Sequence, residues 1–287
     1  MFVTGNIIGG LGNQLFIIFA ALSIAKRDNI DVYFRYSKIS PSGTPRSTYF
    51  DTLLAKLPIV NNYPEQIKKI YTEVNHNLFS VIPKISENTT LSGYFQSRKY
   101  IDSIKSDILN LIELVQPSDN EIANNEINEI RIKSNERKCI FLHVRRGDYV
   151  KAAHYHYNLP MSYYQEAINY HKSLYDCFFV IFSDDLDYCQ QQTVFQEMSL
   201  DEIYYCKLEN DYVELILMSH LDGAIIANSS FSWWGAYLGE LRREQRMSGC
   251  LESELPSLPI IVAPKIWFTG QTCQNDRILP AENWIYF

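Results

Sequence analysis

One decapeptide combines the pattern of a buried strand with side chains that can bind phosphate. Residues 139–148 read Cys-Ile-Phe-Leu-His-Val-Arg-Arg-Gly-Asp, and an apolar run of this kind is typical of a buried parallel strand. Open α/β sheets bind ligands beyond the carboxyl ends of such strands. Arg145 and Arg146 offer forked donors suited to phosphate, His143 can donate or accept a hydrogen bond, and Asp148 adds a carboxylate. A plain arginine–aspartate ion-pair network is an equally good interpretation of these residues alone.

A glycine-rich turn near the start of the chain forms a second polar site. Residues 9–14 read Gly-Gly-Leu-Gly-Asn-Gln between a predicted strand and a predicted helix, which directs backbone N–H groups at an anion or a polar ligand. The NAD fingerprint requires a third glycine where this chain has a leucine, so dinucleotide binding is disfavoured. Asn13 and Gln14 can hydrogen-bond a sugar or a phosphate. Capping of the helix by Asn13 is the alternative.

Two further polar groups follow predicted strands in the second half of the chain. Their candidate ligand-binding residues are Asp184, Asp185, Asn228, Ser229, Ser230 and Phe231. Hydroxyl and N–H groups at a strand-to-helix junction can bind a phosphate or a base edge, and plain N-capping is again the alternative. Phe231 can stack on a guanine or a sugar, although aromatic residues in the first turn of a helix more often belong to the core. Residues 185–187 also match the D-x-D motif of metal-dependent transferases.

The composition limits the class of protein. The chain has 287 residues, 46% of them hydrophobic, and a net charge of −7, which fits one large or two ordinary domains and argues against a nucleic-acid-binding surface. Its six cysteines include no CxxC pair, so neither a disulfide framework nor a zinc site is predicted. We expect no signal peptide and no membrane span. The expected location is the cytoplasm, with peripheral membrane association and the oligomeric state left open.

The elements that must position these residues alternate along the chain. Predicted strands cover 2–8, 31–35, 89–95, 139–143, 176–182, 202–206, 223–227 and 259–262. Predicted helices cover 15–27, 49–57, 64–71, 96–114, 119–134, 161–174, 186–198, 212–220 and a stretch ending near 245, with loops at 37–48 and 151–159. This alternation predicts the α/β class with a doubly wound sheet. The polar stretch before the central strand predicts a boundary between domain 1–135 and domain 136–287.

Five segments resemble, in order, motifs of the α-1,2-fucosyltransferases of glycosyltransferase family 11. They are residues 9–16, 93–97, 143–149, 183–185 and 228–238. The H-x-R-R-x-D element is shared more widely with α-1,6- and protein O-fucosyltransferases, whereas the first and last motifs are more specific to the α-1,2 group. The resemblance implies a GT-B fold, in which two Rossmann-like β/α/β domains face each other across a cleft. The first domain would lie on the acceptor side and the second would bind GDP-fucose.

The resemblance also implies the reaction. L-Fucose would pass with inversion from GDP-fucose to the 2-hydroxyl of a terminal β-galactoside in a glycan, forming an α-1,2 linkage without a metal or another cofactor. The donor-binding residues expected from it are Gly10, Gly12, Asn13, His143, Arg145, Asp184, Asp185, Asn228, Ser229, Ser230 and Phe231. Arg145 would meet the donor β-phosphate, and Arg146 would orient the loop through Asp148. Asp148 is the first candidate for the general base, and a clamp on the arginines is the alternative. Arg145, Asp148 and Asn13 form the expected catalytic set.

Some expectations are weaker, and two other classes of protein stay open. Gln14 and His154 are the weak candidates for acceptor binding, with His154 also the second candidate for the base. The runner-up functions are an NAD(P)-dependent Rossmann oxidoreductase and a nucleotide- or sugar-binding protein without turnover. Neither the acceptor glycan nor the biological pathway can be predicted from the chain.

Overall fold

The chain folds into two compact α/β units. The computed structural model describes residues 1–36, 47–75, 78–247, 260–269 and 284–287. The described residues up to Gln116 form the first unit and those from Pro117 onward form the second. The expected boundary at 135/136 lies later in the chain than this division. The difference arises because helix α3 (Pro117–Ser134) packs on α8, β5 and β6 of the second unit.

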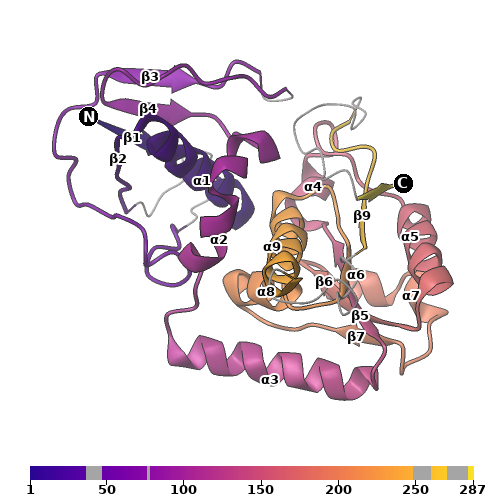
Figure 1. Cartoon of the computed structure of the whole chain (residues 1–287). Helices are drawn as coiled ribbons and strands as arrows, with labels where there is room; N and C mark the ends of the chain where they lie inside the picture. Colours follow the sequence, from indigo (N-terminus) through magenta and orange to yellow (C-terminus); the bar gives the residue numbers. More distant parts are fainter. Residues whose placement is uncertain (37–46, 76–77, 248–259, 270–283) are drawn as a thin grey trace. The chain divides into compact units, whose positions relative to one another are not determined.

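A four-stranded parallel sheet forms the centre of the first unit (Figure 1). Its strands are β1 (Phe2–Gly5), β2 (Asp31–Val32), β3 (Lys69–Thr72) and β4 (Thr89–Ser92). Its helical segments are α1 (Leu11–Asp28), η1 (Arg98–Tyr100), η2 (Asp102–Ile104) and α2 (Lys105–Leu111). The order across the sheet is β2-β1-β4-β3, and each neighbouring pair is parallel. The carboxyl ends of β1 and β4 are therefore adjacent, which brings the glycine turn near the segment that follows β4.

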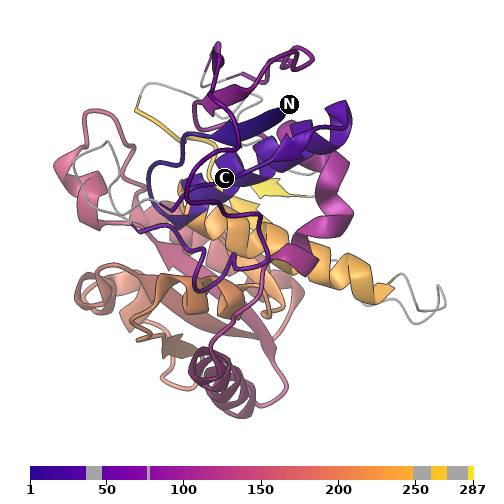
Figure 2. The same cartoon turned by 90° about the vertical axis from the view of Figure 1, so that its left-hand side faces the viewer.

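Helix α1 starts earlier than the sequence predicts. It begins at Leu11, and its N-cap is Gly10, whose missing side chain provides no cap. Asn13 therefore lies inside the first turn and is not the helix cap. The helix is buried along most of its length, because it packs on β1 and β2 (Figure 2). Asn29 ends it in the left-handed conformation, with φ of 54°, a conformation that asparagine tolerates better than most residues.

Three expectations for the first unit are wrong. Residues 49–57 form turns, and the expected helix at 64–71 is replaced by the edge strand β3. The apolar spacing of Ile67 and Ile70 suits a helix, but pairing with β4 overrides that local preference. The expected helix at 96–114 is divided into η1, η2 and α2. Residues 37–46 of the expected loop lie outside the described residues.

A six-stranded sheet forms the centre of the second unit. Its strands are β5 (Lys138–Val144), β6 (Cys177–Ser183), β7 (Ile203–Tyr205), β8 (Gly223–Ile225), β9 (Ile261–Ala263) and β10 (Ile285–Tyr286). The order is β10-β9-β8-β5-β6-β7, and each neighbouring pair is parallel. The carboxyl ends of β5, β6 and β8 are therefore neighbours at one edge. This arrangement brings together three of the four polar sites that the sequence predicts.

Helices cover both faces of this second sheet. They are α4 (Gly147–Lys151), α5 (Met161–Leu174), α6 (Leu186–Gln190), α7 (Thr193–Gln196), α8 (Asp211–Met218) and α9 (Ser230–Met247). In Figure 1, α5 and α7 lie on one side of the strands and α8 and α9 on the other. Every residue of β5 after Lys138 is buried, as the apolar run requires. The expected helix at 186–198 is interrupted between α6 and α7, and β10 was not predicted.

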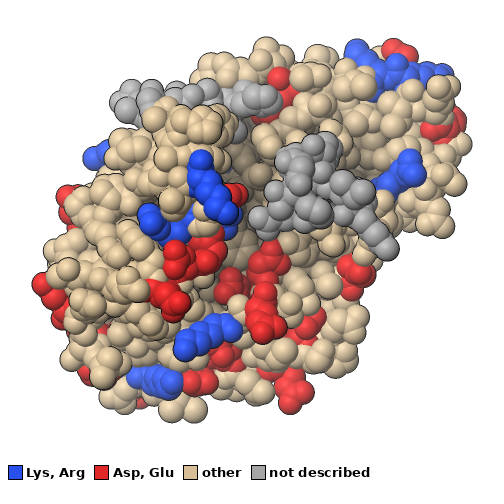
Figure 3. Space-filling view, turned by 180° about the vertical axis from the view of Figure 1, so that it is seen from behind, with Lys and Arg blue, Asp and Glu red and all other residues tan. Residues whose placement is uncertain are grey.

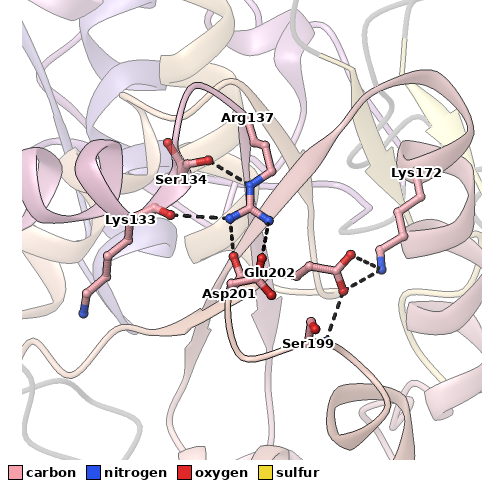
Figure 4. Close-up of polar contacts among 7 residues, drawn as sticks. All are labelled: Lys133, Ser134, Arg137, Lys172, Ser199, Asp201 and Glu202. Atoms are coloured by element: carbon pink, nitrogen blue, oxygen red, sulfur yellow. Dashed lines mark hydrogen bonds and ion pairs between the residues drawn. The ribbon is translucent and has the colours of Figure 1, made fainter.

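Polar contacts hold the amino-terminal edge of the second sheet, opposite the edge that carries the predicted sites. Arg137 donates to the backbone carbonyls of Ser134 and Asp201 and lies 3.5 Å from the Asp201 carboxylate (Figure 4). Beside it, Lys172 donates to both Glu202 oxygens at 3.1 Å. Each such exposed pair contributes only about 0–1 kcal/mol. Together they join the ends of α3 and α5 to the start of β7.

None of the described helices is both long enough and apolar enough to traverse a membrane.

Candidate active site

Arg145 lies directly after β5 and is held by two carboxylates. Its Nη2 atom is 2.5 Å from Oδ1 of Asp148 and its Nη1 atom is 3.0 Å from Oδ2 of Asp184. Only 22% of the Arg145 side chain is exposed. Burial lowers the pKa of Arg145, but the neighbouring Asp184 and Asp148 outweigh it and leave the pKa above its ordinary value. The guanidinium is therefore a fixed cation with a defined orientation.

Asp184 organises the turn between β5 and α4. Its Oδ1 atom accepts the backbone N–H of Arg146 at 2.8 Å while Oδ2 meets the side chain of Arg145. A Cβ placed on Gly147 would collide with the same Oδ2 atom. A Cβ at residue 147 would therefore have to displace the Asp184 carboxylate from its present position. Both oxygens of Asp184 are thus engaged by the arginine turn, and its expected part in binding GDP-fucose stays a prediction.

The two arginines have different environments. The guanidinium of Arg146 stacks 3.7 Å above the ring of Tyr188, on α6, whereas that of Arg145 lies 5.4 Å from the centre of the Tyr149 ring. The expectation that Arg146 orients the loop through Asp148 is therefore wrong. Its backbone is bound by Asp184 and its side chain by an aromatic face. Cation–π contacts of this kind typically contribute about 0.5–2 kcal/mol.

His143 is a neutral imidazole beneath this turn. It is 3% exposed, and burial together with the nearby Arg145 lowers its pKa to about 3. Its ring lies 5.7 Å from that of Phe231 on α9. No described residue forms a hydrogen bond with its Nδ1 atom. At physiological pH His143 can therefore orient a ligand or a neighbour, but it cannot supply positive charge.

The start of α9 contributes the third polar group at this edge. Asn228 is 2% exposed, and its amide donates to the carbonyls of Tyr157 and Trp267 at 2.7 and 2.8 Å. The two N–H groups of its amide thus join two loops, and its expected part in binding GDP-fucose stays a prediction. Ser229 is also buried, whereas Ser230 and Phe231 are partly exposed.

A tyrosine–histidine stack supports helix α4. The rings of Tyr149 and His156 are parallel at 3.8 Å, and the Tyr149 hydroxyl donates to the carbonyl of Asn228 at 2.9 Å. The helix that carries Asp148 is thereby fixed to the start of α9. His154 lies two residues before His156 on an exposed turn. The sequence prediction thus selected the solvated histidine of the pair and missed the packed one.

Asp185 acts as the N-cap of α6. Its carboxylate accepts the backbone N–H of Tyr188 at 3.0 Å, and its own N–H donates to the hydroxyl of Ser183. The D-x-D match at 185–187 therefore has a structural explanation in helix capping. The expected part of Asp185 in binding GDP-fucose stays a prediction.

Glu214, on α8, is a partly buried carboxyl group that the sequence does not single out. Burial, followed by the negative charges of Asp211 and Asp184, raises its pKa to about 8. Glu214 is therefore largely protonated at neutral pH and can act as a hydrogen-bond donor. No pattern in the sequence indicated it, because its perturbation depends on residues distant in the chain.

The glycine turn of the first unit presents a second group of polar side chains. The Oδ1 atom of Asn13 accepts the Nε2–H of Gln96 at 2.6 Å. Gly9 has φ of +78°, and a Cβ placed on it would lie 2.6 Å from Nδ2 of Asn13. Glycine is required at this position both by its left-handed conformation and by the Asn13 amide. Gly10 forms the cap of α1 and Gly12 is buried within its first turn.

Gln14 braces this turn. It is 2% exposed, and its amide donates to the carbonyls of Gly9 and Ser47, both at 3.0 Å. Its role in acceptor binding stays a prediction.

Charged side chains are mixed on the surface drawn in Figure 3. The described Lys and Arg side chains visible on that face form small groups beside Asp and Glu side chains. This face therefore carries mixed charge, in keeping with the modest acidic net charge of the chain.

The chain is similar in sequence to known glycosyltransferases. The model of the family described as Glycosyl transferase family 11 matches residues 51–242. An O-antigen biosynthesis glycosyltransferase of Escherichia coli, WbnK, is 30% identical over 83% of this chain and 70% of its own length. An α-1,2-colitosyltransferase of Escherichia coli is 27% identical over 99% of this chain and 98% of its own. A galactoside 2-α-L-fucosyltransferase of Caenorhabditis elegans is 26% identical over 80% and 67%.

A solved structure supports the fold. The α-1,6-fucosyltransferase NodZ soaked with GDP-fucose has a TM-score of 0.54 and 15% identity to this chain, covering 83% of this chain and 92% of NodZ. At this identity the likeness concerns architecture, and it bears out the GT-B fold. With the family match over residues 51–242, it leads to one conclusion: the chain belongs to glycosyltransferase family 11 and is a glycosyltransferase.

Proposed function

We propose that this protein transfers L-fucose from GDP-fucose to the 2-hydroxyl of a terminal β-galactoside. The observation that carries the proposal is Arg145, a partly buried cation fixed by Asp148 and Asp184 at the carboxyl end of β5. Such a preorganised cation suits a pyrophosphate leaving group. The α-1,2 linkage is supported by relatives named as α-1,2-colitosyl- and galactoside 2-α-L-fucosyltransferases.

The chemistry of the reaction suits the residues at this edge. Breaking the fucose–phosphate bond places negative charge on GDP, and Arg145 stabilises that charge with two forked donors. His143, which is neutral because burial and Arg145 lower its pKa to about 3, orients the nucleotide as a hydrogen-bonding group. We assign donor binding to the unit that starts at Pro117 and acceptor binding to the unit that ends at Gln116.

We assign Asp148 to the clamp on Arg145. The 2.5 Å contact between their side chains supports this role over that of general base, because the Asp148 carboxylate is turned toward the guanidinium of Arg145. The side chain of Asp148 is 60% exposed, so the pair orients Arg145 more than it stabilises the fold. His154 lies on an exposed turn and remains the second candidate for the general base.

We propose that the reaction needs no metal ion. Arg145 provides the counter-charge that a divalent cation supplies in other transferases. Asp185, the first carboxylate of the D-x-D match, is engaged as the cap of α6. The test is to measure transfer after exhaustive chelation with EDTA: full activity supports the proposal, and loss that added Mn²⁺ or Mg²⁺ restores would overturn it.

GDP-colitose is the second candidate donor. The relative named as an α-1,2-colitosyltransferase matches this chain almost end to end. Competition between the two donors at equal concentration, followed by mass spectrometry of the product, separates the two candidates. Preferential fucosylation supports the first and preferential colitosylation the second.

The proposed function is tested by measuring GDP release. The protein is incubated with GDP-fucose and a panel of β-galactosides, with NAD(P) oxidoreduction assayed in parallel. Acceptor-dependent GDP release supports transfer. Binding of GDP-fucose without release would indicate a binding protein, and turnover of NAD(P) alone would indicate the oxidoreductase.

A further inference from the structure

We propose that Gln96 is a positioning residue that sets the orientation of the Asn13 amide. Gln96 follows β4 and Asn13 lies in the first turn of α1, yet their side chains meet at 2.6 Å. The inference rests on the proposed function, because it requires a bound substrate with an oxygen that accepts a hydrogen bond from the Asn13 amide. The sequence analysis assigns no role to Gln96, and the inference adds it to the residues that determine the rate.

The hydrogen bond determines which end of the Asn13 amide faces the glycine turn. Gln96 donates its Nε2–H to Oδ1 of Asn13, so Nδ2 points away from Gln96. That Nδ2 atom lies close to Gly9, since a Cβ placed on Gly9 would be 2.6 Å from it. The turn at the start of α1 therefore presents a side-chain N–H donor in addition to the backbone donors of an uncapped helix N-terminus. An amide turned the other way would present a carbonyl oxygen there and repel a substrate oxygen.

Burial makes Gln96 suitable for this role. Gln96 is 7% exposed, and its Oε1 atom has no hydrogen-bond partner among the described residues. An unsatisfied buried amide oxygen is costly, so stability alone does not favour glutamine over an apolar residue of similar size. A function that needs the Nε2 donor explains why the amide is present.

The backbone before Gln96 is held in an unusual conformation. Phe95 has φ of +50°, which bulky residues rarely adopt. Its ring is fully buried and contacts those of Tyr71 and Tyr100 at centroid distances of 6.5 and 5.4 Å. This aromatic packing holds the strained residue, and the adjacent Gln96 is thereby directed at Asn13.

The orientation is tested without turnover by NMR. In the wild-type protein we expect a nuclear Overhauser effect between the Asn13 NH₂ protons and the Hα protons of Gly9. Gln96→Glu keeps the size of the side chain but can only accept, so the Asn13 amide should rotate and this effect should disappear. Persistence of the effect in Gln96→Glu, with unchanged intensity, would overturn the inference.

The contribution to rate is tested by a double-mutant cycle. Gln96→Glu should lower kcat about tenfold or more while the melting temperature stays close to that of the wild type. In the Asn13→Ala background the same change should have no further effect, because Gln96 acts through Asn13. Equal loss in both backgrounds would contradict the inference. Gln96→Met, which lacks a donor, gives the cycle a second variant if Gln96→Glu is poorly folded.

Failure of this inference can be told apart from failure of the proposed function. Wild-type protein that releases no GDP with any acceptor contradicts the function, while the NMR experiment still decides the orientation of the Asn13 amide. If the wild-type protein is active and the effects of Gln96→Glu and Asn13→Ala simply add, only the role of Gln96 is contradicted.

Discussion

The Asp184 carboxylate binds the side chain of Arg145 with one oxygen and the backbone N–H of Arg146 with the other, at 3.0 and 2.8 Å. One side chain thus fixes both the direction of the guanidinium and the turn that carries it. Because β5 and β6 are parallel neighbours in register, the residue after β6 reaches the residue after β5.

Asp184→Asn should separate these two functions. The amide can still accept the Arg146 N–H through its oxygen, but it loses the charge-assisted bond to Arg145. We expect donor affinity to fall about tenfold to a hundredfold, in line with about 1.5–3 kcal/mol for such a bond. The measurement is the KM for the donor beside the melting temperature. The matched control is Asp187→Asn, an exposed residue of α6, and equal effects of both variants would show that Asp184 has no special role.

Gly147→Ala should impair the same turn by steric means. Its Cβ would collide with Oδ2 of Asp184, so we expect overpacking to cost about 1–3 kcal/mol of unfolding free energy together with a large loss of activity. Gly239→Ala on α9 is the control, since the nearest atom to its Cβ would be 3.5 Å away. We expect Gly239→Ala to raise the free energy of unfolding by about 0.5–1 kcal/mol. Chemical denaturation measures both, and a fully active Gly147→Ala variant would contradict the required close approach.

Glu214→Gln should change how stability depends on pH. The pKa of Glu214 is raised from 4.5 to about 8, so its stabilising contribution is complete below pH 4.5 and is lost as the pH rises through 8. Glutamine resembles the protonated acid and does not ionise. The variant should therefore melt like the wild type at pH 4.5 and higher than the wild type at pH 8.5. Each kcal/mol recovered corresponds to about 2–4 °C. If the melting temperatures of variant and wild type differed by the same amount at both pH values, the raised pKa of Glu214 would be contradicted.

Asp148→Asn should distinguish a clamp from a general base. The clamp role predicts weaker binding of GDP, because Arg145 loses one of its two anchors. A base role predicts intact GDP binding with transfer lowered by about 10²–10⁴. We expect the clamp result, measured by calorimetry with GDP alongside turnover. A variant unchanged in both would exclude Asp148 from the site.

The central motif could be predicted because its information is local. The apolar run of β5 ends at His143-Val144, and the arginines must then emerge at the carboxyl edge of a parallel sheet. The same logic places Asp184 after β6 and Ser229 after β8. The contacts of Asn228 could not be predicted, because its amide binds two loop carbonyls that are distant in the chain. The cap that Asp185 provides to α6 is a local contact.

The first unit was harder to predict. The β3 strand has an exposed edge position and a helix-like spacing of isoleucines, so only its pairing with β4 reveals it. Asn13 was a candidate from its place after the glycine turn, but its partner Gln96 lies far along the chain. Whether the Asn13 group and the Arg145 group act on the same substrate stays a prediction.

The central claim is that this glycosyltransferase makes an α-1,2-fucosyl linkage with Arg145 as the cation that stabilises the leaving group. The direct measurement is NMR of the product formed from GDP-fucose and a terminal β-galactoside, with wild-type protein and with Arg145→Lys. We predict an α-linked fucose on the galactose 2-hydroxyl from the wild type. Arg145→Lys should be about 10²–10³-fold slower, because a single ammonium cannot replace the fork. A different linkage, or near-full activity of Arg145→Lys, would contradict the claim.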